Sequence, residues 1–203
     1  MINDSDDDES TYIQFLLTDS NLPTGSFVAS SGLESFVKHG FFQSQSLSQN
    51  PTSTINFIQD NLATYARSAL PFVSDAHRIV QEFSRNNTET ETTRETLSDL
   101  KALDELYEVM TLNHVAKRAS KSQGVALLTL YSKGFSRPAF LIPQERRLTT
   151  QETRLMGLID QLKLIIRREE TQGHLPICWG VLTGALQLSL GTACFSDKWD
   201  GIT

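Results

Sequence analysis

The residues of this 203-residue chain whose types and spacing could do chemistry are His174 and Cys178, four positions apart. On one helix face this spacing would place an imidazole beside a thiol, either as two ligands of a metal ion or as a base and a nucleophile. The competing interpretation is structural. In it, Pro176 starts the helix, His174 is left at the N-terminal cap, and Cys178 is a small buried side chain. The structural interpretation is favoured because free cysteine is most often found in protein cores.

Other arrangements of residues that carry chemistry are absent from the sequence. No two of the four histidines are at helical spacing, so no helix face is predicted to chelate a metal with two imidazoles. The chain has no glycine-rich phosphate loop, no GxSxG nucleophile elbow and no HExxH zinc motif. We therefore expect a protein that is not an enzyme and that holds no cofactor and no resident metal.

The chain is acidic, with a net charge of −6 and a pI of about 5.2. Binding to nucleic acid or to an anionic membrane requires a surface rich in lysine and arginine, so both are disfavoured. Acidic residues crowd positions 4–9, and we predict that residues 1–10 are a disordered acidic tail. Two cysteines, an acidic N-terminus in place of a basic signal sequence, and no apolar run of membrane-spanning length favour a cytoplasmic location.

Apolar residues recur at intervals of three and four, the period of an amphipathic helix, whereas the alternation typical of strands is lacking. We therefore predict an all-α, single-domain helical bundle over residues 11–203, with polar loops. Thr149 and Glu152 form a predicted capping box, and Pro71 is expected to separate two helices. The predicted helices cover residues 27–37, 55–66, 71–83, 100–114, 155–166 and 176–191.

Three segments are predicted to be mobile loops, near residues 43–54, 84–96 and 137–150. The first has a single leucine to bury, the second has no apolar residue, and the third contains two prolines and is expected to cross between helices. Segments so poor in apolar side chains cannot offset the entropy that they lose on ordering.

Two features allow both a structural and a binding interpretation. Gly180 and Gly184 are one helical turn apart, so they could form an oligomer seam, but tight packing within the domain is favoured because the whole stretch is apolar. Lys117, Arg118 and Lys121 form a basic cluster at the end of the predicted third long helix. These cations could complement the helix dipole or dock an anionic partner, and spacing alone does not decide between the two.

Three segments, in matching order and separation, resemble the UreF family over roughly residues 12–190. The first, Asp19–Glu34, contains a Leu-Pro-x-Gly-Ser-Phe turn followed by Ser-x-Gly-Leu-Glu. The second, Leu103–Leu128, contains Leu-Asp-Glu-Leu, Lys-Arg-Ala-Ser and Gln-Gly. The third is a Gly-His-x-Pro helix start at Gly173–Pro176. Each segment alone is a weak pattern, whereas the three in order are specific.

The resemblance implies an all-helical protein that tends to dimerise and hydrolyses nothing itself. Family members bind a second accessory protein, UreD (also called UreH), and the GTPase UreG. The assembly acts on apo-urease, where GTP hydrolysis is coupled to nickel insertion, so a member serves as a chaperone-like scaffold and as a regulator of the GTPase. By position, the resemblance marks candidate interface or architectural residues: Pro23, Gly25, Ser26, Glu34, Lys117, Arg118, Ser120, Gln123, Gly124, His174 and Pro176.

The end of the chain departs from the family pattern. Members continue past the Gly-His-x-Pro helix with further helices and a tail that binds UreD, and residues 191–203 do not match that ending. We expect a shortened or atypical C-terminus, an uncovered apolar face, and weak binding of UreD or poor solubility. Two alternatives to the scaffold stay open: a small metal- or thiol-dependent enzyme that uses His174 and Cys178, and a generic helical interaction module unrelated to urease.

Overall fold

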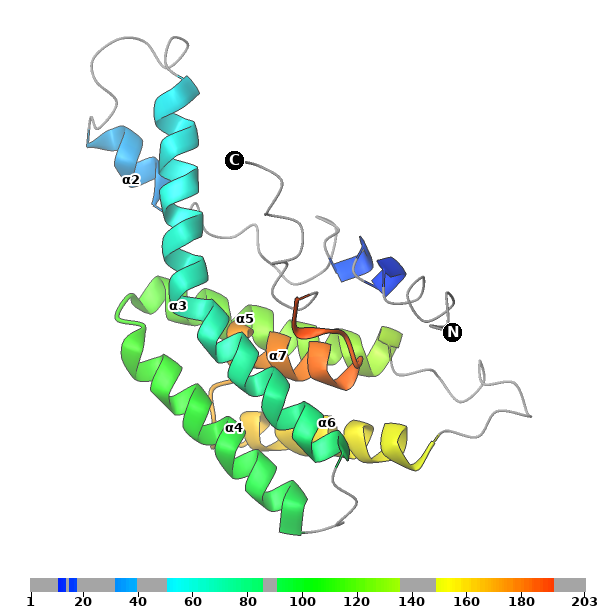
Figure 1. Cartoon of the computed structure of the whole chain (residues 1–203). Coiled ribbons are helices and arrows are strands. Elements are labelled where there is room, and N and C mark those ends of the chain that lie inside the picture. Colours follow the sequence, from blue (N-terminus) through cyan, green and yellow to red (C-terminus); the bar gives the residue numbers. More distant parts are fainter. Residues whose placement is uncertain are drawn as a thin grey trace.

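The computed structural model describes residues 11–13, 15–17, 32–39, 51–85, 91–135 and 149–191. Every regular element within these residues is a helix and none is a strand, which confirms the predicted all-α bundle (Figure 1). None of the helices described there is both long enough and apolar enough to cross a membrane. The elements are α2 (Leu33–Lys38), α3 (Pro51–Arg85), α4 (Glu91–Met110), α5 (His114–Leu130), the π-helical turn η2 (Tyr131–Phe135), α6 (Thr150–Arg167) and α7 (Leu175–Ala185).

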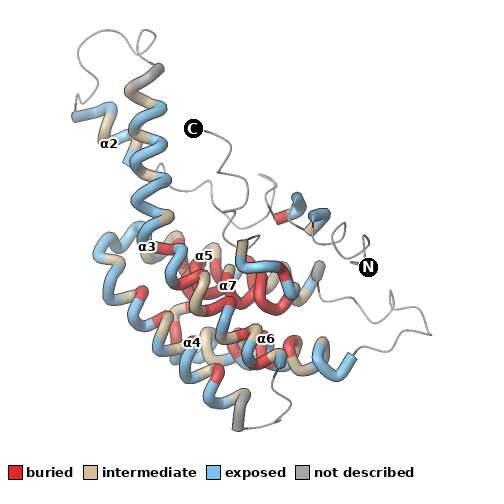
Figure 2. Tube along the Cα trace, in the orientation of Figure 1, coloured by how far each residue is buried: buried red, intermediate tan, exposed pale blue. Residues whose placement is uncertain are grey.

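Helix α7 forms the centre of the core and packs mainly against α3 and α5. Nine of its 11 residues are buried, because it is apolar on all sides and no face can be left in water. Figure 2 shows the buried positions gathered on α7 and on the helix faces turned towards it. Around it, the fully buried large side chains include Leu100, Leu127, Leu128, Leu155, Leu158 and Ile159.

Two glycines on α7 allow α3 to approach closely. A Cβ atom on Gly180 would lie 2.5 Å from the carbonyl oxygen of Val73, and one on Gly184 would lie 3.0 Å from the Cβ of Val80. Contacts this short leave no room for a side chain. The two glycines are therefore used for packing within the domain, as favoured above, rather than for an oligomer seam.

Helix α3 is continuous through Pro71, so the prediction of two helices separated there is wrong. The proline ring removes one backbone hydrogen bond, and burial of Phe72, Val73 and Ala76 in the following turn outweighs that loss. Figure 1 shows the helix changing direction between its upper and lower halves. The upper half stands away from the bundle, and its apolar stripe is left half-exposed, with Ile58 at 53%.

The predicted third long helix is also wrong at its end, because α4 stops at Met110 and His114 starts α5. Asn113 is the N-cap of α5, and its side-chain oxygen accepts the backbone N–H groups of Val115 and Ala116. Lys117 therefore lies at the start of a helix. The interpretation that the basic cluster complements a helix C-terminus is overturned.

The helices extend into all three segments that were predicted to be loops. Residues 51–54 and 84–85 belong to α3, residues 91–96 belong to α4, where Thr96 is buried, and Thr150 starts α6. The acidic tail 1–10 and residues 136–148 lie outside the described residues. Of the predicted first helix, only α2 from Leu33 onwards is described.

The starts of α6 and α7 agree with the sequence predictions, whereas the end of α7 does not. The capping box at the start of α6 is confirmed: Glu152 accepts the Thr149 backbone N–H at 2.7 Å, and Thr149 Oγ1 accepts the Glu152 backbone N–H at 3.1 Å. Helix α7 starts around Pro176 as predicted but ends at Ala185 instead of Gly191. The residues that follow leave the helical path, since Gln187 has a φ of 56°.

Candidate functional site

Two of the three segments that resemble the family come together at one point of the fold. The turn before α7, residues 171–174, packs between the C-terminal half of α4 and the first turns of α5. Of the predicted site residues, Lys117, Ser120, Gly124 and His174 contribute to this junction, and Pro176 follows it in the first turn of α7. We call this arrangement the α4–α5–α7 junction.

Asp104 on α4 organises the turn. Its carboxylate is 2% exposed and accepts four hydrogen bonds from the turn. Oδ2 accepts the Thr171 hydroxyl at 2.5 Å and the backbone N–H groups of Gln172 and Gly173 at 2.7 and 2.8 Å; Oδ1 accepts the His174 N–H at 2.9 Å. Successive N–H groups that point at one anion form a backbone nest, and here the protein's own carboxylate fills it. Gly173 makes the turn possible with a φ of 72°.

Glu108, one helical turn after Asp104, joins all three helices. Its carboxylate lies 2.7 Å from His174 Nε2, 3.0 Å from Lys117 Nζ and 3.1 Å from Lys121 Nζ. Desolvation raises the pKa of Glu108, but the hydrogen bonds from Lys117, His174 and Lys121 outweigh it and lower the pKa to about 2. Glu108 is therefore an anion at any physiological pH.

His174 is held as a neutral imidazole. Burial lowers its pKa, and this effect outweighs the hydrogen bond that the ring donates to Glu108, which raises the pKa. The ring is fully buried, it meets the edge of Tyr107 with centroids 5.0 Å apart, and Nδ1 has no partner among the described residues. Neutral His174 thus donates from Nε2 to Glu108, which orients the ring.

Helix α5 contributes the hydroxyl group of Ser120 to the junction, and at Gly124 it packs closely against the turn before α7. Ser120 Oγ accepts the backbone N–H of Leu175 at 3.0 Å, which satisfies a donor in the first turn of α7. A Cβ on Gly124 would collide with the carbonyl oxygen of Gly173 and would lie 3.0 Å from Cys178 Sγ. The motif residues Ser120 and Gly124 are therefore explained by packing and by helix-end hydrogen bonding.

The pairing of His174 with Cys178 that the sequence spacing suggested is not a metal or catalytic site in this geometry. His174 is the N-cap of α7, and its Nε2 is bonded to Glu108. Cys178 is fully buried, and desolvation raises the pKa of its thiol well above the ordinary value, so it is a poor nucleophile and a poor ligand. Among the described residues, no group of three or more histidine, cysteine or carboxylate side chains could hold a metal ion. The structural interpretation of this pair is the one that fits.

The remaining predicted residues are three that the structure does not describe and three that lie outside the junction. Pro23, Gly25 and Ser26 lie outside the described residues. Glu34 is exposed on α2, beside the upper half of α3, where Phe36 packs on Phe57 with ring centroids 4.4 Å apart (Figure 1). Gln123 is half-buried on α5, and Arg118 is exposed there without an ion pair to any described residue.

The junction depends on Asp104 and Glu108, and neither was among the predicted site residues. Asp104 entered the sequence analysis only as part of the Leu-Asp-Glu-Leu motif. Their signal was present: the two carboxylates are four residues apart, as are Lys117 and Lys121, so each pair lies on one helix face. The pairing across helices became visible only in the fold. Its chemistry is to fix three helices relative to one another, with each charge bonded within the junction.

Comparisons with known proteins give a consistent family. A family model described as UreF matches residues 48–200. The chain is 35% identical over 205 aligned positions to urease accessory protein 6 of Cryptococcus neoformans var. grubii, covering 90% of this chain and 64% of that protein. It is 25% identical to an uncharacterized UreF-like urease accessory protein of Schizosaccharomyces pombe, covering 94% and 67% of the two chains.

A plant relative aligns with a smaller part of the chain. Urease accessory protein F of Oryza sativa subsp. indica is 33% identical over 127 residues, which are 63% of this chain and 41% of that protein. The chain therefore spans about two thirds or less of the length of these relatives. No solved structure matches the chain.

Proposed function

Because the chain belongs to the UreF family of urease accessory proteins, we propose that it is a cytoplasmic, non-catalytic scaffold for nickel insertion into urease. It binds UreD (UreH) and the GTPase UreG, and the assembly acts on apo-urease while GTP is hydrolysed. Nickel is the cargo of this process.

The family match over residues 48–200 is the observation that carries the proposal. The α4–α5–α7 junction supports it, because the motif residues there serve the architecture. Ser120 accepts a helix-end N–H, and His174 donates to Glu108. A scaffold needs such a rigid core beneath the surfaces that its partners contact.

A homodimer is part of the proposal. The upper half of α3 supports it, since this helix presents a stripe of half-exposed apolar residues to solvent: Ile55, Ile58, Leu62 and Tyr65. Contiguous apolar surface of this kind marks interfaces in soluble proteins.

The proposal is tested by reconstitution with UreD, UreG and apo-urease from the same organism. We expect the chain to capture UreD and UreG in a pull-down, and the nickel content of urease to rise when the chain is added with GTP and nickel. Incubated alone, the chain should hydrolyse neither GTP nor urea. Capture of neither partner, or equal nickel content with and without the chain, would contradict the scaffold function.

A further inference from the structure

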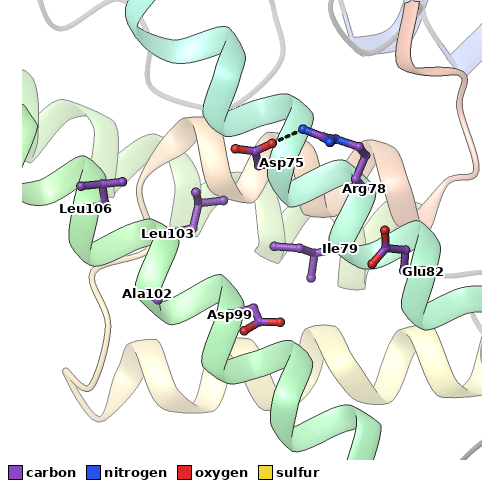
Figure 3. A pocket seen from close by; sticks show the side chains of 8 residues that line it. All are labelled: Asp75, Arg78, Ile79, Glu82, Asp99, Ala102, Leu103 and Leu106. Atoms are coloured by element: carbon purple, nitrogen blue, oxygen red, sulfur yellow. Dashed lines mark hydrogen bonds and ion pairs between the residues drawn. The ribbon is translucent and has the colours of Figure 1, made fainter.

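A groove of about 440 Å³ runs between the lower half of α3 and α4. Ile79 from α3 and Leu103 from α4 point into the space between the two helices, and Leu106 lies at one end (Figure 3). Leu106 is 53% exposed, and Val109 and Met110, three and four residues further along α4, are more exposed still. The groove thus has an apolar floor that continues towards the end of α4.

The rim of the groove is acidic. Asp75, Glu82 and Asp99 line it together with a single cation, Arg78, and Arg78 is paired with Asp75. Glu82 and Asp99 have no ion-pair partner among the described residues, and they lie at the end of the groove opposite Leu106 (Figure 3). Two such carboxylates beside an apolar floor are complementary to a partner that has apolar side chains and positive charge.

We propose that this groove docks an amphipathic helix of a urease-assembly partner, with apolar residues at helical spacing and Lys or Arg at the end that meets Glu82 and Asp99. The proposal rests on the scaffold function, to which it adds the surface and the chemistry of the partner. A channel between two packed helices accepts the ridge of a third helix, and apolar anchors at intervals of three and four residues suit a floor built by Ile79, Leu103 and Leu106. The charge of the rim disfavours a second copy of this acidic chain as the occupant.

The test measures the affinity of the folded chain for purified UreD, UreG and apo-urease separately, at low and high salt. The double variant Glu82→Lys/Asp99→Lys should weaken the binding of one of these partners by about tenfold or more and reduce the salt dependence of that binding. The variant Leu106→Asp should weaken the same partner by a similar factor. Matched controls make equal changes at residues that do not line the groove: Glu105→Lys/Asp160→Lys, and Leu112→Asp, whose leucine is 91% exposed.

Each other outcome overturns the proposal in a distinct way. If the native chain binds partners and the groove variants bind them equally well, the scaffold function stands and the groove is not the docking site. If the groove variants change only self-association in analytical ultracentrifugation, the occupant is a second copy. If Leu106→Asp lowers the Tm of the isolated chain far more than Leu112→Asp does, a segment of this chain already covers the groove. If the native chain binds none of the three proteins, the scaffold function fails and this inference fails with it.

Discussion

Asp104 on α4 accepts the backbone N–H of His174 at 2.9 Å, although 70 positions separate the two residues. Through this bond and its three neighbours, one buried carboxylate holds the turn that starts the central helix α7. The arrangement makes Asp104 a residue of the fold rather than of a reaction, and its contribution can be measured as stability.

Replacing Asp104 should destabilise the protein strongly. Asp104→Asn keeps one acceptor oxygen and places an amide N–H₂ against a backbone donor, and each orphaned buried donor costs about 1–3 kcal/mol. Asp104→Ala removes both oxygens and should be worse. Chemical denaturation gives the free energies of unfolding. The control Glu105→Gln changes an exposed neighbour with only a 3.9 Å ion pair, and should stay within about 0.5 kcal/mol. Equal effects of the two amide substitutions would contradict the role of Asp104.

Two glycine-to-alanine substitutions should change the free energy of unfolding in opposite directions. At Gly124, an added methyl group collides with the Gly173 carbonyl oxygen, and overpacking of this kind costs about 1–3 kcal/mol. At Gly157, on the exposed face of α6, a Cβ meets nothing within 4 Å, so alanine should stabilise the helix by about 0.5–1 kcal/mol. Thermal unfolding of both variants beside the native chain checks the pair. A stable Gly124→Ala protein would mean that α5 and the turn are less closely packed than the structure has them.

Mild acid should destabilise the fold through its buried histidines. Burial lowers the pKa of both His77 and His174 below 6.5 in the folded protein. The unfolded chain then binds more protons than the folded one as pH drops through and below about 6.5. This stability is therefore fully present above that pH and is lost as pH falls, by at most about 1.4 kcal/mol per histidine per pH unit.

The pH effect can be assigned by comparing Tm at pH 7.5 and pH 5.5. Over this interval the Tm of the native chain should fall further than the Tm of His77→Gln, because the substitution removes one titrating group. An identical fall of Tm in the native chain and in His77→Gln would show that buried His77 does not control the acid response.

Cys178 should be inert towards thiol reagents until the protein unfolds. Its side chain is fully buried, and burial raises the pKa of the thiol, so little thiolate is present or reachable. In a Cys194→Ser background, Cys178 is the sole thiol, and a disulfide reagent should react with it in denaturant but not in native buffer. Rapid reaction under native conditions, or stoichiometric metal that Cys178→Ala removes, would revive the thiol- or metal-enzyme alternative.

The members of the basic cluster should differ in their effect on stability. Lys121 is 3.1 Å from Glu108, whereas Arg118 is exposed and has no ion pair to a described residue. Lys121→Gln should cost up to about 1 kcal/mol, because both side chains are partly exposed and water screens the pair. Arg118→Gln should leave unfolding unchanged. If Arg118→Gln also weakens partner binding, Arg118 contributes to the docking surface that the sequence left open.

The local features of the sequence determined a large part of this fold. Periodic apolar residues predicted the helices, and Thr149 with Glu152 predicted the start of α6, because a capping box is complete within four residues. The position of Pro176 predicted the start of α7. These predictions held because their causes lie within one or two helical turns.

Tertiary packing decided the rest. Burial against α7 carries α3 through Pro71, where local propensity favours a break. In the sequence, Asp104 and Glu108 resemble ordinary polar residues of a helix. In the fold, the backbone N–H groups of the turn before α7 bind Asp104, and the buried imidazole of His174 binds Glu108. A hydrogen bond between distant residues depends on where the helices meet, and helix periodicity carries no information about that. The sequence thus determined the helices, and only the packed structure decided which polar residues join them.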